Sequence, residues 1–60
     1  MKTSELKKML TVKGCYVVSH GGRHDKWFSP ITGKMFVIPR HDSQELPIGT
    51  EKSIRKQAGV

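Results

Sequence analysis

Cysteine and long apolar runs are almost absent from this 60-residue chain, and each absence excludes a class of protein. Cys15 is the only cysteine, so no intramolecular disulfide can form and a zinc site made of four thiolates is excluded. No apolar run approaches the roughly 18 residues of a membrane-spanning helix. Met1–Glu5 lead into charged residues and not into the apolar core of a secretion signal. These features predict a protein of the reducing cytoplasm with no membrane partner.

Acidic residues are also few. Five Asp and Glu stand against eleven Lys and Arg, which gives a formal net charge of +6. This surplus favours an anionic partner, and nucleic acid is favoured over a membrane surface because no basic amphipathic segment carries a broad aromatic face. The alternative is that the charge only maintains solubility. A chain of this length is expected to form one domain, residues 1–60, that buries about 60% of the surface its unfolded state exposes.

Apolar residues recur at helical spacing near both ends of the chain. Residues 5–13 place their apolar side chains on one helical face, and Ser4 just before them is the expected N-cap. Residues 51–57 form the second predicted helix, with Thr50 as its N-cap. A glycine is expected to end each helix, Gly14 the first and Gly59 the second.

Three runs rich in strand-forming residues lie between the predicted helices, at 15–20, 25–29 and 34–38. Gly21–Gly22 predicts a tight turn between the first two, because glycine adopts positive φ at little steric cost. Residues 30–33 begin with proline, end with glycine and predict the second turn. The strands should form a three-stranded antiparallel meander with both helices on one face, since nothing else can bury their apolar sides. The predicted fold is α+β, in the order α-β-β-β-α, with the other sheet face open.

Trp27 and Phe28 are adjacent aromatic residues in the second predicted strand. Neighbouring strand residues point to opposite faces of a sheet, so one ring should lie in the core and the other on the open face. The ring on the open face could stack on a base or pack against a protein partner. Alternatively, it is a strand aromatic shielded by neighbouring Lys or Arg side chains.

His24 is the candidate reactive residue, because the predicted turn delivers it to the start of the returning strand between two cations. An imidazole takes up and releases a proton near neutral pH. The flanking Arg23 and Lys26 would attract a phosphate. The alternative is an ordinary surface histidine. A metal site that joins His24 to His20 and His41 has little support, because no pair shows the spacing of a known zinc site. We therefore expect no metal and no cofactor.

The most specific pattern in the chain is residues 46–59, Leu-Pro-Ile-Gly-Thr-Glu-Lys-Ser-Ile-Arg-Lys-Gln-Ala-Gly. Together with Val37–His41 and Ser4–Leu6, it resembles the HicA toxins of bacterial and archaeal toxin-antitoxin systems, small ribonucleases that cleave messenger RNA. The resemblance covers nearly the whole chain. It implies the fold of a double-stranded-RNA-binding domain, which agrees with the order of elements predicted from the residues.

The resemblance also implies which histidine acts. The family's catalytic histidine follows a glycine and usually a small residue in the hairpin, and this position corresponds to His24. Arg23 departs from the commoner serine, and Asp25 replaces a residue that is often histidine or apolar. These departures leave His20 as an alternative, although it belongs to the preceding strand.

Two classes of function stay open at this point. In the first, the chain is a toxin and metal-independent endoribonuclease, in which His24 acts as general acid or base for attack of a ribose 2′-hydroxyl on the adjacent phosphate. Arg23 and Lys26 would bind the RNA, and His41 is a candidate second proton-transfer group. In the second, the chain is a non-catalytic RNA-binding module of the same fold. The resemblance implies a HicB-type antitoxin as protein partner, so a monomer or a toxin-antitoxin hetero-oligomer is expected.

Overall fold

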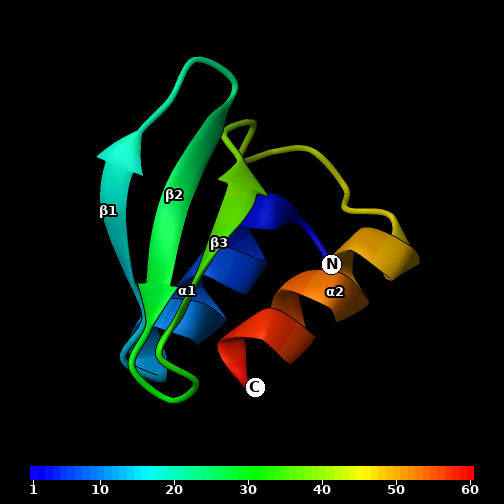
Figure 1. The fold of residues 1–60 in the computed structure, drawn as a ribbon. Coiled ribbons are helices and arrows are strands. Elements are labelled where there is room, and N and C mark those ends of the chain that lie inside the picture. Colours follow the sequence, from blue (N-terminus) through cyan, green and yellow to red (C-terminus); the bar gives the residue numbers. More distant parts are fainter.

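Helices and strands follow one another in the predicted order. The computed structural model describes residues 1–60 and contains α1 (Thr3–Val12), β1 (Tyr16–His20), β2 (His24–Ser29), β3 (Lys34–Pro39) and α2 (Ile48–Ala58), as drawn in Figure 1. The sheet has the order β1-β2-β3, and both strand pairs are antiparallel. Both helices lie on one side of it (Figure 1). The predicted α+β fold of order α-β-β-β-α is confirmed.

The core fills the space between the helices and one face of the sheet. Alternate residues of β2 and β3 point inward, as a strand requires, and they meet the apolar faces of α1 and α2. The buried apolar residues are Leu6, Leu10, Cys15, Trp27, Phe36, Ile38, Leu46, Ile54 and Ala58. Since no element covers the opposite face, the side chains that point outward from β2 and β3 stay accessible.

The first helix begins earlier than predicted, and Ser4 is not its cap. The N-cap is Lys2, whose side chain makes no capping hydrogen bond. The backbone N–H groups of Thr3 and Ser4 instead donate to the carbonyl oxygens of Gln44 and Asp42, each over 3.0 Å. A helix leaves its first N–H groups without partners inside the helix. A segment far along the chain supplies those partners here, so no local cap is required.

The second helix also begins before its predicted start, and Thr50 is not its cap. Pro47 is the N-cap, and the N–H of Glu51 donates to the Pro47 carbonyl over 2.9 Å. Proline suits the entry to a helix because its fixed φ is already helical and its missing N–H would have no partner there. Thr50 therefore lies within the first turn, and its side chain is free to face outward.

The hairpin between β1 and β2 contains glycine for a different reason from the one predicted. Neither Gly21 nor Gly22 has positive φ, a conformation found only at Gly14, Gly33 and Gly59. A Cβ atom on Gly21 would lie 2.5 Å from the carbonyl oxygen of His24. The Gly21 N–H donates to that same oxygen over 2.9 Å. Gly21 is thus required by close backbone approach, which holds the first residue of β2 in place.

Candidate active site

The alternation of β2 separates the neighbours of His24 onto two faces. His24 and Lys26 are exposed, whereas Asp25 and Trp27 are each only 7% exposed. Trp27 packs in the core, and Phe28 lies on the open face with its ring centroid 5.6 Å from that of Tyr16. The prediction that the two adjacent aromatic residues point to opposite faces is confirmed.

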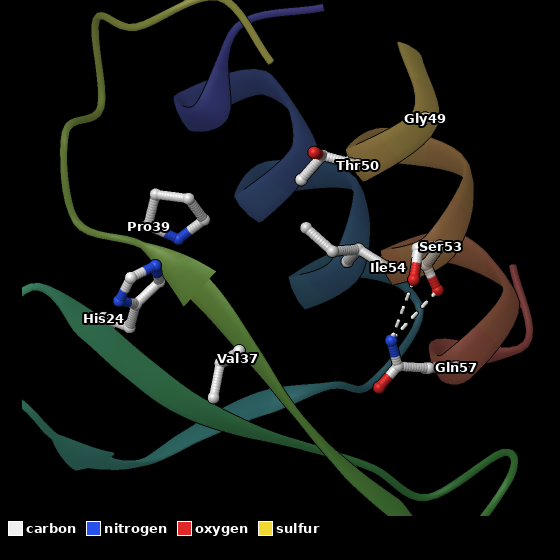
Figure 2. A pocket seen from close by; sticks show the side chains of 8 residues that line it. All are labelled: His24, Val37, Pro39, Gly49, Thr50, Ser53, Ile54 and Gln57. Atoms are coloured by element: carbon white, nitrogen blue, oxygen red, sulfur yellow. Dashed lines mark hydrogen bonds between the residues drawn. The ribbon is translucent and has the colours of Figure 1, made fainter. Parts of the chain in front are cut away.

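His24 lines a pocket of about 330 Å³ between β3 and α2 (Figure 2). It is paired with Pro39 across the β2–β3 ladder, and its neighbour Lys26 is paired with Val37. Directly opposed residues share a face of the sheet, so Val37 and Pro39 form the strand wall of the pocket beside the imidazole. His24 is the only ionisable side chain among the lining residues.

The opposite wall belongs to α2 and is neutral and polar. Thr50, Ser53 and Gln57 follow one another at helical spacings of three and four residues, which places them on one face of the helix. Gln57 Nε2 donates to Ser53 Oγ over 3.1 Å and to the Ser53 carbonyl over 3.3 Å. Ile54 fixes this wall because its own side chain is buried in the core. The pocket therefore joins one imidazole to two hydroxyl groups and one amide.

Asp25, a buried carboxylate, lies on the face of the sheet opposite to His24. Asp25 Oδ1 is 3.1 Å from His20 Nδ1 and 3.4 Å from Arg40 Nε. Arg40 Nη1 also donates to the Gly21 carbonyl over 2.9 Å. These contacts join β1, the hairpin and the exit of β3. His20 shares its face with Asp25, so it points away from the face that carries His24.

The remaining candidate residues lie outside the pocket. Arg23 is exposed at the hairpin, where its carbonyl oxygen accepts a hydrogen bond of 3.2 Å from the Arg40 N–H. Its side chain and that of Lys26 form no ion pair within the chain, in contrast to Arg40. His41 is exposed and is not among the pocket residues. The structure brings together His24 and residues of α2, and it does not bring His20 or His41 into the same pocket.

Neither a metal-binding cluster nor a membrane-spanning helix occurs among these residues. No three side chains of the types His, Cys, Asp and Glu approach one another closely enough to hold a metal ion. The two helices are too short and too polar to cross a membrane. The pocket thus offers hydrogen-bonding and proton-transfer groups and no carboxylate.

Reading the sequence alone missed the α2 wall of the pocket. Thr50, Ser53 and Gln57 are the uncharged polar residues in a helix whose other polar side chains are charged. The helical spacing of these three residues indicates from the sequence that they share one face of the helix. Nothing in the local sequence, however, indicates that this face lies beside His24, because the two segments meet only through the packing of α2 along β3.

Comparison with known proteins shows which family the chain resembles. The family model described as the HicA toxin of bacterial toxin-antitoxin systems matches residues 3–60. A probable mRNA interferase HicA 2 of Photorhabdus laumondii subsp. laumondii is 38% identical over 60 residues, covering 100% of this chain and 98% of the relative. A probable mRNA interferase HicA 1 of the same organism is 40% identical over 60 residues, with both chains covered in full.

A third relative shows the same extent of similarity. A probable mRNA interferase HicA of Pseudomonas fluorescens is 37% identical over 60 residues, covering 100% of this chain and 97% of the relative. The matches reach from α1 to the end of α2, so they include the hairpin, β3 and the α2 wall of the pocket. On these grounds the chain belongs to the HicA toxin family.

Proposed function

We propose that this chain is the toxin of a cytoplasmic toxin-antitoxin system and a metal-independent endoribonuclease that cleaves messenger RNA, with His24 as its general acid or base. One observation supports the proposal beyond family membership: His24 is exposed and is the only ionisable group that lines the pocket. A catalytic base must lie within hydrogen-bond reach of the proton that it removes. An accessible imidazole with room beside it for a substrate meets this requirement.

In the proposed reaction, His24 is the one side chain that takes up a proton. The ribose 2′-hydroxyl gives its proton to His24 as its oxygen attacks the adjacent phosphorus, and the bond from phosphorus to the 5′ oxygen breaks. The 5′ oxygen takes a proton from water, and the hydroxide that forms removes the proton from His24, which restores the neutral imidazole. The products are a 2′,3′-cyclic phosphate on one fragment and a 5′-hydroxyl on the other. Proton transfer of this kind contributes about 10²- to 10⁴-fold to the rate.

Arg23 and Lys26 are the proposed contacts to the RNA backbone. Lys26 lies on the same face of β2 as His24, at an alternate position and so roughly 7 Å along the strand. Arg23 directly precedes His24 at the hairpin. Because neither side chain is paired with a carboxylate in the free chain, both are available to phosphate oxygens, and each contact would release a counterion from the RNA.

Incubation of the pure chain with defined RNA in EDTA tests the proposal. The unchanged chain should yield fragments, and His24→Ala should lower the cleavage rate by about 100-fold or more, the range expected of a general base. His41→Ala tests the candidate second proton-transfer group, and it should leave the cleavage rate nearly unchanged because His41 is exposed and lies outside the pocket. His20→Ala is a poorer control because it removes a contact to Asp25. Full activity of a folded His24→Ala variant would overturn the assignment.

The same experiment separates the enzyme from a binding module. A non-catalytic RNA-binding domain would bind RNA with salt-sensitive affinity and release no fragments. Cleavage by the wild-type chain that disappears in EDTA would contradict the metal-independent mechanism, and it would leave the endoribonuclease activity standing.

The open face of the sheet is the proposed binding surface of a HicB-type antitoxin. Three apolar side chains on this face are about half exposed, Tyr16 at 54%, Met35 at 49% and Val37 at 53%. Phe28 lies between the strands of Tyr16 and Met35 and is paired with both residues. An antitoxin seated here would cover this apolar surface together with His24, and an acidic surface on it would speed its encounter with the basic toxin.

A further inference from the structure

We propose that the pocket between β3 and α2 is a subsite for a single nucleotide next to the cleaved bond, in which Gln57 contacts the edge of the base and Ser53 positions Gln57. The proposal rests on the endoribonuclease function proposed above. It assigns to α2 a part in RNA recognition and separates that part from proton transfer by His24.

The size of the pocket favours a single nucleotide. Its volume of about 330 Å³ lies at the lower end of the range of small-molecule sites, roughly 300 to 1,000 Å³. Its lining comes from three elements, with His24 on β2, Val37 and Pro39 on β3, and the remaining residues on α2. The pocket is an open hollow formed by separate elements, and its volume offers room for about one nucleotide. Protein recognition of RNA sequence generally uses unpaired bases that are splayed out of the strand in this way.

The chemistry of the lining fits a ribonucleotide. No Asp or Glu lines the pocket, so nothing there repels the anionic backbone. The Thr50 and Ser53 hydroxyls can each donate and accept hydrogen bonds, and Gln57 adds an amide, which are the groups that ribose hydroxyls and base edges pair with. Val37 and Pro39 supply an apolar surface against which the flat side of a base can pack (Figure 2).

Gln57 is held in an orientation that leaves an acceptor free. Its Nε2 donates to Ser53, and its Oε1 points away from Ser53 (Figure 2). No other residue of the chain donates to this oxygen. An amide oxygen accepts a hydrogen bond from a base N–H, whether exocyclic amino or ring imino, and bases differ in where they carry these donors. Ser53 therefore acts as a positioning residue and Gln57 as a specificity residue.

The test compares Gln57→Leu with Gln44→Leu, a matched substitution at an exposed glutamine of the segment after β3. Each variant is incubated with an RNA library of random sequence, and the base frequencies around the cleaved bonds are counted. Gln57→Leu should change the preference at one position next to the cleaved bond by about tenfold, the scale of a lost base contact. Gln44→Leu should reproduce the wild-type profile. An unchanged profile for Gln57→Leu would overturn the proposal.

Steady-state kinetics and ligand binding provide two further measurements, which would not change if Ser53 and Gln57 were important only for the fold. Ser53→Ala and Gln57→Leu should raise KM on a single oligonucleotide with little change in kcat, whereas His24→Ala should lower kcat. In a titration followed by NMR, the four nucleoside 3′-monophosphates should shift the backbone signals of α2 in the wild-type chain and shift them less in Gln57→Leu. Shifts confined to β1, or identical in both proteins, would contradict the subsite.

These readouts distinguish the subsite from the proposed activity. If the chain never cleaves RNA but the nucleotides still shift the α2 signals, the endoribonuclease proposal fails and the binding site stands. If His24→Ala abolishes cleavage while Gln57→Leu changes neither the library profile nor the NMR titration, the endoribonuclease proposal is supported and the subsite proposal is wrong. If only an antitoxin, and no nucleotide, shifts the α2 signals, the pocket belongs to a protein interface and the proposal is also wrong.

Discussion

At the scale of single residues, Gly59 shows how one position can carry two constraints. It ends α2 in the left-handed conformation with φ of 79°, which only glycine adopts routinely. A Cβ atom on it would also lie 2.8 Å from Thr32 Cγ2 and 2.9 Å from Ile31 Cγ2. The turn after β2 is bonded to this end of α2, since Thr32 Oγ1 donates to the Gln57 carbonyl over 2.7 Å. The end of the helix therefore has little room to shift.

Gly59→Ala should lower the free energy of unfolding by about 2–5 kcal/mol, combining roughly 1–2 kcal/mol for left-handed backbone with about 1–3 kcal/mol for overpacking. Urea denaturation followed by circular dichroism measures the change. Gly49→Ala is the matched control, because a Cβ there meets nothing within 4 Å and φ is not positive. That change should be neutral or stabilising by up to about 1 kcal/mol. Equal midpoints for the two variants would contradict the account.

At the scale of elements, the segment between β3 and α2 fixes the start of α1. It provides the carbonyl groups that cap the helix, and the Leu46 N–H donates to the Met1 carbonyl over 3.0 Å. Lys7 Nζ contacts Asp42 Oδ1 at 2.7 Å. The amino group of Met1 donates to the carboxylate of Glu45. The hydrogen bond to Glu45 is the main cause that raises the pKa of this amino group above its usual 8.0; desolvation opposes the rise in part, and the charges of Glu45, Glu51 and Glu5 add to it.

The sign of this shift gives a pH prediction. A group whose pKa is raised on folding stabilises the fold fully below its unfolded pKa of 8.0, and this contribution is lost as the pH rises through the folded value. The free chain should therefore be more stable than an Nα-acetylated chain at about pH 7. The difference between their urea midpoints should shrink as the pH rises above about 8. The two chains differ only in the amino group, so every other group that titrates in this range affects both equally. A difference in urea midpoint that did not change with pH would contradict the role of the amino group.

At the scale of the whole molecule, two features determine which surface is available to an anionic partner: the net charge of +6 and the presence of one sheet face that no helix covers. The helices cover one face, and the open face presents Lys26 and His24 next to the exposed apolar residues of β1 and β3. RNA binding on this face should depend on salt through the cations of β2 and the hairpin, because α1 lies on the other side of the sheet (Figure 1).

Arg23→Ala and Lys26→Ala should each weaken RNA binding and lower the slope of log affinity against log salt by roughly 0.7, the value for one phosphate contact with a single strand. Fluorescence anisotropy with a labelled RNA, in a chain made inactive by His24→Ala, measures both effects. Lys8→Ala removes the same charge from α1 and should change the slope less. If the slope changed equally in all three variants, the RNA would lie elsewhere on the surface.

The proposed antitoxin surface predicts a separate set of effects. Met35→Asp should weaken binding of the cognate antitoxin by about tenfold or more, since it places a charge within an apolar contact region. Val12→Asp is the control, because Val12 is 84% exposed on α1 at a distance from the open face. RNA and antitoxin should compete, and His24 should lose solvent access in the complex. Simultaneous binding of both without loss of affinity would contradict this arrangement.

Local physics explains what the sequence alone determined. Helical and strand periodicities are properties of consecutive residues, so the order α-β-β-β-α and the antiparallel meander followed from them. The strict alternation of a strand separated Trp27 from Phe28. Gly14 and Gly59 were predicted to end the helices, and both have the positive φ that glycine adopts at little steric cost. The place of His24 at the start of the returning strand followed from the glycines of the hairpin and the family pattern.

Tertiary structure decided whatever depends on groups far apart in the chain. The starts of both helices were wrongly predicted, and α1 is capped by the carbonyls of Asp42 and Gln44, which lie far along the chain from it. Asp25 is buried where Arg40, directly after β3, and His20 of β1 both contact it. The pocket beside His24 exists because Ile54 anchors α2 in the core and turns its neutral polar face toward β3. Such meetings depend on packing in three dimensions, and no local propensity encodes them.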